Sequence, residues 1–111
     1  MTVPSIPEVV EVYDIKDRLK YITSLDIRKI ANDLIEEIKG WDTANILIEP
    51  TKYDISAKVS GRVFAYICPR RQSFMIYTFD NEKKWTGFPV NQKEDLEPIK
   101  VLLRNNIDRL R

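Results

Sequence analysis

Three short segments with the residue pattern of β-strands follow one another through the middle of the chain, over residues 52–80. Residues 62–68 and 74–80 consist largely of β-branched and aromatic types, with Gly, Pro, Ser or Asn at their borders, as is typical of strands. Upstream, apolar Tyr53, Ile55, Ala57 and Val59 stand between polar neighbours. The pattern predicts three antiparallel strands in a meander, joined by a turn at residues 60–61 and a loop at residues 69–73.

The alternation also predicts which side chains share a face of this sheet. Because successive side chains of a strand point to opposite faces, Val63, Ala65 and Ile67 are expected on one face. The other face is expected to carry Phe64, Tyr66 and Cys68. Neither set is polar, whereas a small antiparallel sheet normally leaves one face to water. The second apolar face therefore indicates either additional cover or a binding surface.

Three segments show the spacing of amphipathic helices. Asp14 can cap a first helix with apolar residues at 15, 19 and 22, and Ser24 can cap a second helix whose apolar stripe runs from Ile27 to Ile38 and which ends at Gly40. Residues 94–110 repeat the pattern. Short strands are also expected at residues 46–48 and, interrupted by Gly87 and Pro89, at residues 85–90.

The predicted fold class is α+β. We expect an antiparallel four- to five-stranded meander sheet covered on one face by two N-terminal helices and a C-terminal helix. Residues 1–7, with two prolines, are interpreted as a flexible arm, and residues 8–111 as a single domain. Residues 8–13 fit either a strand or the entry to a helix.

Composition agrees with one globular domain. The chain has 111 residues, of which 43% are hydrophobic and 32% charged, as in soluble proteins. No apolar run approaches the roughly 20 residues needed to cross a membrane, and the N-terminus lacks the features of a secretion signal. The single cysteine cannot form an internal disulfide, so we expect a cytoplasmic protein with no membrane partner.

Charge is distributed unevenly along the chain. Residues 1–50 carry ten acidic and six basic side chains, whereas residues 51–111 carry seven acidic and twelve basic ones. The basic half contains the predicted sheet. This asymmetry favours an anionic partner, although the chain as a whole, at +1, is far less basic than dedicated nucleic-acid binders.

Residues that could carry catalysis are scarce. The chain has no histidine, which removes the commonest general base and zinc ligand. Its three glycines form no phosphate-binding loop, and the acid-x-lysine triplet at residues 37–39 lies on a helix rather than on the strand a nuclease site needs. Cys68 is either a thiol activated by Arg70 and Arg71 or a half-buried strand residue. We expect no catalytic activity, no cofactor and no metal; an enzyme using Cys68 or a carboxylate pair is the remaining alternative.

A set of basic and aromatic residues at or beside the strand ends is the candidate working surface. Cationic side chains neutralise phosphate, and flat rings offer stacking platforms for unpaired bases. This combination favours nucleic acid or another phosphate-bearing ligand; the alternative is that the rings are core and the arginines belong to a solvated loop. We expect Trp85 to be only partly buried. The candidate binding residues are Arg62, Arg70, Arg71, Lys83, Lys84, Tyr66 and Trp85.

Residues 52–78 resemble a family of small bacterial domains of unknown function. The shared cadence is a strand that begins with tyrosine, a short turn, a strand carrying Phe64-Ala65, a proline-basic loop at residues 69–71 and a further apolar strand. In that family the domain often ends longer proteins related to predicted transport proteins and restriction-type enzymes. The resemblance implies an accessory domain. The family's later Gly-His-Trp-Gly-like segment has no histidine here, where residues 84–87 read Lys-Trp-Thr-Gly.

Two hypotheses of function follow. The first is a non-catalytic accessory domain that binds nucleic acid or a phosphate-bearing ligand through the basic and aromatic edge of the sheet. The second is a protein–protein interaction or oligomerisation domain of a larger bacterial protein, in which the apolar second face of the sheet packs on a partner or on a second copy.

Overall fold

A computed structural model describes residues 14–111 of the chain. The predictions of an arm at residues 1–7 and of a strand or helix entry at residues 8–13 lie outside the described residues. In chain order the elements are α1 (Ile15–Leu19), α2 (Leu25–Trp41), β1 (Ile46–Pro50), β2 (Ile55–Val59), β3 (Arg62–Pro69), β4 (Phe74–Phe79), β5 (Trp85–Val90), a short 3₁₀ turn η1 (Lys93–Asp95) and α3 (Leu96–Leu110).

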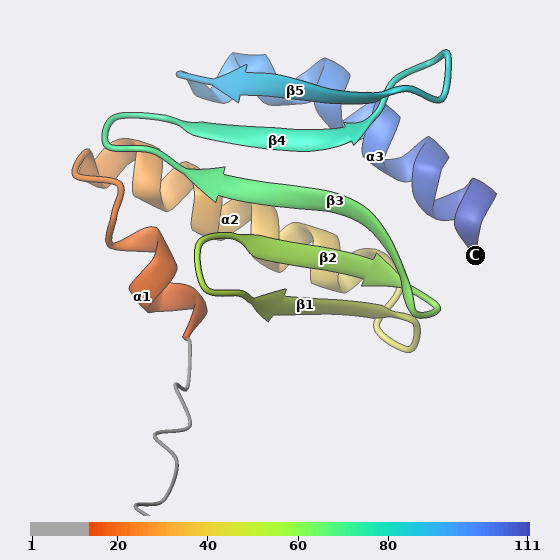
Figure 1. The fold of residues 1–111 in the computed structure, drawn as a ribbon. Coiled ribbons are helices and arrows are strands. Elements are labelled where there is room, and N and C mark those ends of the chain that lie inside the picture. The colour runs from red at the N-terminus through yellow and green to blue at the C-terminus, as the bar shows by residue number, and fades with distance from the viewer. Residues whose placement is uncertain (1–13) are drawn as a thin grey trace, which may run out of the picture.

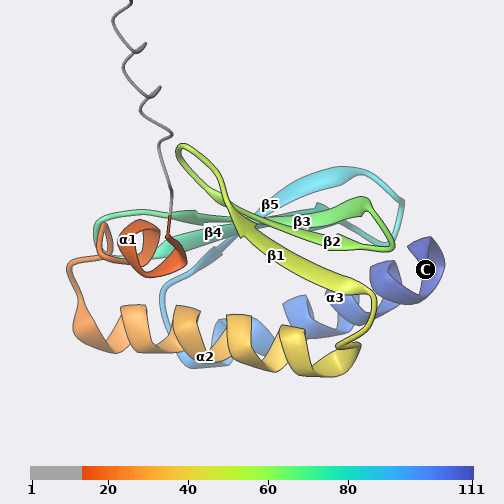
Figure 2. The same ribbon diagram turned by 90° about the horizontal axis from the view of Figure 1, so that it is seen from below.

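The five strands form one open antiparallel sheet whose spatial order is the order of the chain, β1-β2-β3-β4-β5 (Figure 1). The helices α2 and α3 lie together behind this sheet, on one of its faces (Figure 2). The predicted α+β fold with an antiparallel meander is therefore confirmed. Hereafter we call the face that α2 and α3 cover the helix face, and the opposite one the open face.

Local chemistry sets the hairpin turns. Ser60 and Gly61 both have positive φ, 51° and 82°, as in the type I′ turn that matches the twist of paired strands. Between β4 and β5, the Asp80 carboxylate accepts hydrogen bonds from the N–H groups of Glu82 (2.8 Å) and Lys84 (2.9 Å). These bonds, led by the one from Lys84, hold the pKa of Asp80 below its usual range.

The core lies between the helix face and the two long helices. Its largest members are fully buried aliphatic and phenyl side chains, and α2 and α3 each contribute one apolar stripe to it, as their spacing predicts. The fully buried side chains include Leu34, Ile35, Ile38, Ile55, Val59, Phe64, Phe74, Ile76, Val90 and Leu103.

A β-bulge changes the faces that were predicted for β3. Ala57 pairs with Ala65 but Lys58 pairs with Val63, so Phe64 is an extra residue in the ladder. Phe64 is consequently fully buried, while Val63 is only half-buried. The prediction that Phe64 shares a face with Tyr66 was wrong, because the alternation of side chains restarts at the bulge.

The predicted strand at residues 52–59 is shorter than its alternation suggests. β2 begins at Ile55, because residues 51–54 form a turn in which the Thr51 N–H donates to the Asp54 carbonyl (2.7 Å). Tyr53, expected on the buried side with Ile55, is instead 74% exposed in the β1–β2 loop. A turn of this kind interrupts the two-residue period without changing the composition.

One polar group joins α3 to the middle of the sheet. The Asn106 side-chain amide, on α3, donates to the Thr78 hydroxyl (2.9 Å) and to the Phe79 carbonyl (2.8 Å). Thr78 in turn donates to the carbonyl of Phe64 (2.7 Å) at the bulge. Asn106 is 5% and Thr78 0% exposed, so this chain of hydrogen bonds satisfies polar groups that burial would otherwise leave unpaired.

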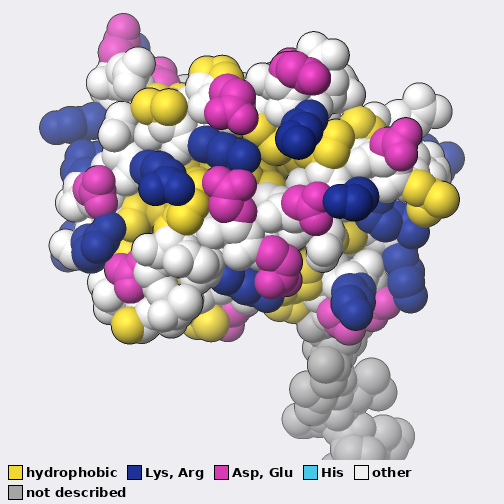
Figure 3. All heavy atoms as spheres, turned by 180° about the vertical axis from the view of Figure 1, so that it is seen from behind, with side chains coloured by type: hydrophobic (Ala, Val, Ile, Leu, Met, Phe, Trp, Pro, Cys, Tyr) yellow, Lys and Arg dark blue, Asp and Glu magenta, His cyan; other side chains and the backbone are white. Residues whose placement is uncertain are grey.

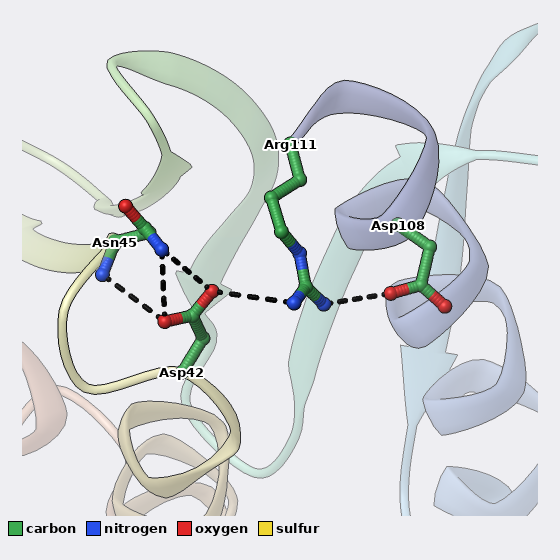
Figure 4. Close-up of polar contacts among 4 residues, drawn as sticks. All are labelled: Asp42, Asn45, Asp108 and Arg111. Atoms are coloured by element: carbon green, nitrogen blue, oxygen red, sulfur yellow. Dashed lines mark hydrogen bonds and ion pairs between the residues drawn. The ribbon is translucent and has the colours of Figure 1, made fainter.

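A second polar cluster connects the C-terminal ends of α2 and α3 (Figure 4). The Asp42 carboxylate accepts from the Asn45 side-chain amide (3.0 and 3.1 Å) and backbone N–H (3.3 Å), and it also lies 3.6 Å from the Arg111 guanidinium. Arg111 also pairs with Asp108 at 2.7 Å. The Asn45 side chain contributes most to holding the pKa of Asp42 below its usual range, and the positive charge of Arg111 adds to it.

The outer surface of α2 and α3 is a mixed-charge surface. Lysines and arginines alternate there with aspartates and glutamates rather than forming a patch of one sign (Figure 3), and exposed ion pairs such as Lys29–Asp33 (2.7 Å) and Lys100–Glu37 (2.9 Å) connect them. Within residues 14–111, no helix is both long enough and apolar enough to cross a membrane.

Candidate binding cleft

The open face contains a cleft of about 830 Å³, within the range typical of ligand sites. Its floor comes from β3, β4 and β5, and its walls from α1, the β1–β2 loop and the end of β3. We call it the tyrosine cleft. The residues that line it are Asp17, Arg18, Lys20, Tyr21, Tyr53, Asp54, Tyr66, Cys68, Pro69, Arg70, Tyr77 and Trp85.

Three aromatic side chains on neighbouring strands form the floor. Tyr66 of β3 stands directly opposite Tyr77 of β4 in the ladder, so the two rings share the open face. Trp85, at the start of β5, meets Tyr66 edge to face with ring centroids 5.7 Å apart and also packs on Phe79 at 4.8 Å. Trp85 is 42% exposed, as expected from the sequence. The floor therefore presents ring surface to solvent while remaining fixed by ring–ring contacts.

Gly87 makes room for one of these rings. It is the ladder partner of Tyr77, and a Cβ atom placed on it would lie 2.7 Å from Cε1 and 3.2 Å from Cδ1 of Tyr77. Such distances are too short for ordinary contact, so the ring occupies the space that a side chain at position 87 would need. Tyr77 thus lies across β5, which a larger residue at position 87 would prevent.

Hydrogen bonds between loops fasten the walls of the cleft. The Arg18 guanidinium, on α1, donates to the Lys52 carbonyl of the β1–β2 loop (2.5 Å). Thr23, just after α1, donates its backbone N–H (2.6 Å) and its hydroxyl (2.8 Å) to the Arg71 carbonyl of the β3–β4 loop. These bonds hold α1 beside the sheet, although it is only five residues long. Tyr21, which follows α1, is 56% exposed at the rim.

Charged groups of both signs surround the cleft, with the cations in excess by one. Arg18, Lys20 and Arg70 are the cations, and Asp17 and Asp54 the carboxylates. Lys20 and Asp17 form an exposed ion pair at 3.4 Å, which contributes little to stability.

Cys68 lies at the cleft, in surroundings that disfavour the thiolate form of its side chain. It is 8% exposed. Burial, aided by the nearby Asp54 carboxylate, raises the pKa of the Cys68 thiol to about 12, and the opposing effect of Arg70 is smaller. Arg70 favours the thiolate, as expected, but burial and the Asp54 carboxylate outweigh it, which favours the alternative of a largely buried strand cysteine. Among residues 14–111, no three cysteine or acidic side chains gather as metal ligands would.

The basic residues that were predicted to form one binding surface lie at two different ends of the sheet. Arg70 lines the cleft with Tyr66 and Trp85, and Arg71 follows in the same loop, where its carbonyl accepts from Thr23. The remaining three, Arg62, Lys83 and Lys84, lie at the other end of the sheet, where β3 begins and β4 turns into β5 (Figure 1). Trp85 begins β5 at this same end, but none of the three basic residues lines the cleft. That end is roughly 25 Å from Arg70, the length of the eight-residue β3 at about 3.3 Å per residue.

Sequence reasoning missed the parts of the cleft that come from outside the strands. Arg18 and Tyr21 belong to α1 and its end, and Tyr53 and Asp54 to the β1–β2 loop. Residue type is the one signal that points to them: the chain has five tyrosines, and all four within the described residues line this cleft.

Fold and cleft together define an α+β protein with a five-stranded antiparallel meander, two long helices on one face and an aromatic cleft on the other. Comparison with known proteins gives no narrower class, since no protein-family model, no curated protein and no solved structure matches the chain. The resemblance of residues 52–78 to small bacterial domains stays a prediction.

Proposed function

We propose that this chain is a non-catalytic binding module that takes a nucleic acid, as a phosphate-bearing ligand, in the tyrosine cleft. The observation that carries the proposal is that Tyr66, Tyr77, Trp85 and Arg70 all line one cleft on the face of the sheet that the long helices leave open. Stacking surfaces next to cations are the two elements that nucleic-acid recognition combines.

The chemistry of the cleft supports binding rather than catalysis. A thiol whose pKa is raised to about 12 stays protonated at neutral pH, so Cys68 is a poor nucleophile. The chain has no histidine to act as a base beside it. The single cysteine, which cannot form an internal disulfide, supports the proposal that the protein works in a reducing cytoplasm.

Trp85 offers a direct test, because it reports from the floor of the cleft. The other tryptophan, Trp41, lies at the end of α2 with the Arg104 guanidinium 4.2 Å from its ring centroid. Its Nε1 has no hydrogen-bond partner among the described residues, so a Trp41→Phe variant loses no hydrogen bond and leaves Trp85 as the only tryptophan. We expect its fluorescence to change saturably on titration with short DNA or RNA at low salt.

A matched pair of arginine variants then locates the interaction. In the Trp41→Phe background, Arg70→Ala should weaken binding about tenfold, as is typical for the loss of a hydrogen bond to a charged group. Arg62→Ala, at the far end of β3, should leave the affinity unchanged. The proposal fails if neither DNA nor RNA binds, or if Arg62→Ala weakens binding as much as Arg70→Ala does.

The second hypothesis, a protein or a second copy as partner, has less support. Among residues 14–111, the large apolar side chains that are more than half exposed outside the cleft are Leu25, Leu47 and Val101, and they belong to three different elements, α2, β1 and α3. The cleft is therefore the surface of the described residues that best fits such a partner. Sedimentation at increasing concentration tests this hypothesis, because self-association would shift with a Trp85→Ala substitution.

A further inference from the structure

We infer that the cleft binds single-stranded rather than double-stranded nucleic acid, with unpaired bases stacked on Tyr66, Tyr77 and Trp85. This inference rests on the proposed function. The inference adds to the proposed function the form of the nucleic acid and the interactions that hold it in the cleft.

The positions of the three rings favour unpaired bases as their partners. They come from three adjacent strands, Tyr66 and Tyr77 as direct ladder partners and Trp85 in edge-to-face contact with Tyr66. Aromatic side chains on the exposed face of an antiparallel sheet are a recognised platform for unpaired bases. The bases of a duplex are already stacked on one another, so rings on the floor of a walled cleft reach them only if the duplex opens.

The walls of the cleft are fixed in place, which also favours a single strand. Arg18 holds α1 to the carbonyl of Lys52, and Thr23 holds the end of α1 to the carbonyl of Arg71. α1 and the β1–β2 loop therefore stand as fixed walls, with the exposed Tyr21 and Tyr53 on their rims. A single strand can enter between such walls and splay its bases, whereas a duplex keeps its bases stacked and offers the protein only its phosphates and the base edges in its grooves.

The small number of cations in the cleft also favours a single strand. The cleft contains three cations, Arg18, Lys20 and Arg70, and two carboxylates, so it can neutralise very few phosphates. The outer surface of the helices carries intermixed charges of both signs (Figure 3) and offers no broad basic face for a duplex. Because each neutralised phosphate of a single strand contributes about −0.7 to the slope of log K against log salt, we expect a slope no steeper than about −2. Stacking then supplies most of the affinity.

Gly87 connects this inference to one replaceable residue. The Tyr77 ring lies where a side chain at position 87 would be, with Cε1 2.7 Å from the site of a Cβ atom. Gly87→Ala should push the ring away from β5 and disturb the platform, although no group that could contact the nucleic acid has been removed.

The experiment compares ligands of one sequence by fluorescence anisotropy: a labelled single strand of about ten nucleotides, as DNA and as RNA, its blunt duplex, and a competing mononucleotide. We expect the single strand to bind at least about tenfold more tightly than the duplex and the mononucleotide, with the shallow salt slope given above. Trp85→Ala and Tyr77→Ala should each weaken the single strand about five- to 100-fold, as is typical of losing one stacked base. Tyr77→Phe, which keeps the ring, should weaken binding much less than Tyr77→Ala does.

Each result has a distinct meaning. Equal or tighter binding of the duplex overturns the inference but leaves the proposed function standing, whereas binding of no nucleic acid defeats both. A mononucleotide that competes as well as the strand shows that the site takes a free nucleotide, which also overturns the inference. Since Tyr77→Ala could disturb folding, thermal unfolding of each variant is measured, and Gly87→Ala serves as the second variant; unchanged binding in both, with folding intact, rules out the ring platform.

Discussion

The two faces of one sheet differ less in how apolar they are than in which apolar residues they carry. The helix face is built from aliphatic side chains and phenyl rings, such as Ile67, Phe74 and Ile76, each no more than 1% exposed. The open face of the same strands carries Tyr66, Tyr77 and Trp85, whose rings each have a polar atom.

This difference teaches how a core and a binding surface can be distinguished within one strand. Purely hydrocarbon side chains lose nothing by complete burial, whereas tyrosine and tryptophan combine a large apolar surface with a group that needs a hydrogen-bond partner. They are therefore suited to a surface that is exposed in the free protein and covered when a ligand binds. Alternation identifies the two faces of a strand, and residue type indicates what each face does.

The largest expected effect comes from exchanging one aromatic residue on each face for alanine. Phe74→Ala removes a fully buried ring and should lower the free energy of unfolding by about 3–5 kcal/mol. Trp85→Ala, on the open face, removes edge-to-face contacts with Tyr66 and Phe79, which are worth about 0.5–1.5 kcal/mol beyond the area they bury. It should cost less than Phe74→Ala, because Trp85 is already 42% exposed. Urea denaturation measures both, and equal losses would mean that the open face is as much a part of the core as the helix face.

An intermediate effect is expected where α3 meets the sheet. Asn106→Ala leaves the Phe79 carbonyl without its side-chain donor and removes the donor to Thr78, so the free energy of unfolding should fall by about 1–3 kcal/mol. The neighbouring Asn105 is exposed, and Asn105→Ala is the matched control, expected to change stability by less than about 0.5 kcal/mol. Similar losses in the two variants would show that helix propensity, rather than the buried hydrogen bonds, decides the outcome.

The smallest effect concerns pH and the corner where α2 and α3 end. Because the Asp42 carboxyl has a pKa below its ordinary value in the folded protein, it stabilises the fold above that ordinary value, and the stabilisation is lost as pH falls through the folded pKa. Asp42→Asn should therefore make stability less dependent on pH in the acid range, as thermal unfolding at a series of pH values would record. Arg111→Gln, which removes the positive charge beside Asp42, tests whether Asn45 or the arginine is responsible; an effect as large as that of Asp42→Asn would point to the arginine.

The fold could be predicted largely because its determinants are local. Each strand pairs with the next along the chain, so alternation and turn residues such as Ser60 and Gly61 were enough to predict the meander, and the helical stripes identified α2 and α3. The bulge at Phe64 could not be predicted in this way, because an extra residue in the ladder leaves the composition of a strand unchanged.

The cleft was less predictable because it depends on contacts between distant segments. Tyr66, Arg70 and Trp85 were identified from the strands, but Arg62 lies at the opposite end of β3 from Arg70. Their separation follows from the direction of the strand, whereas the sequence pattern shows only that both stand at strand ends. Tyr21 and Tyr53 enter the cleft through hydrogen bonds between α1 and two loops, and no periodicity in the chain reports those bonds.

The meander also bears on how the protein assembles during folding. Since every strand contacts its immediate successor, each hairpin closes only a short loop, and the entropic cost of bringing partners together stays low. The helix α3, the last element in the sequence, contacts the central strands β3 and β4. Its packing covers strands that the hairpins have already paired. We therefore expect rapid folding, in which neighbouring strands pair and bring the tyrosines onto one face before α3 packs on the other face of the sheet.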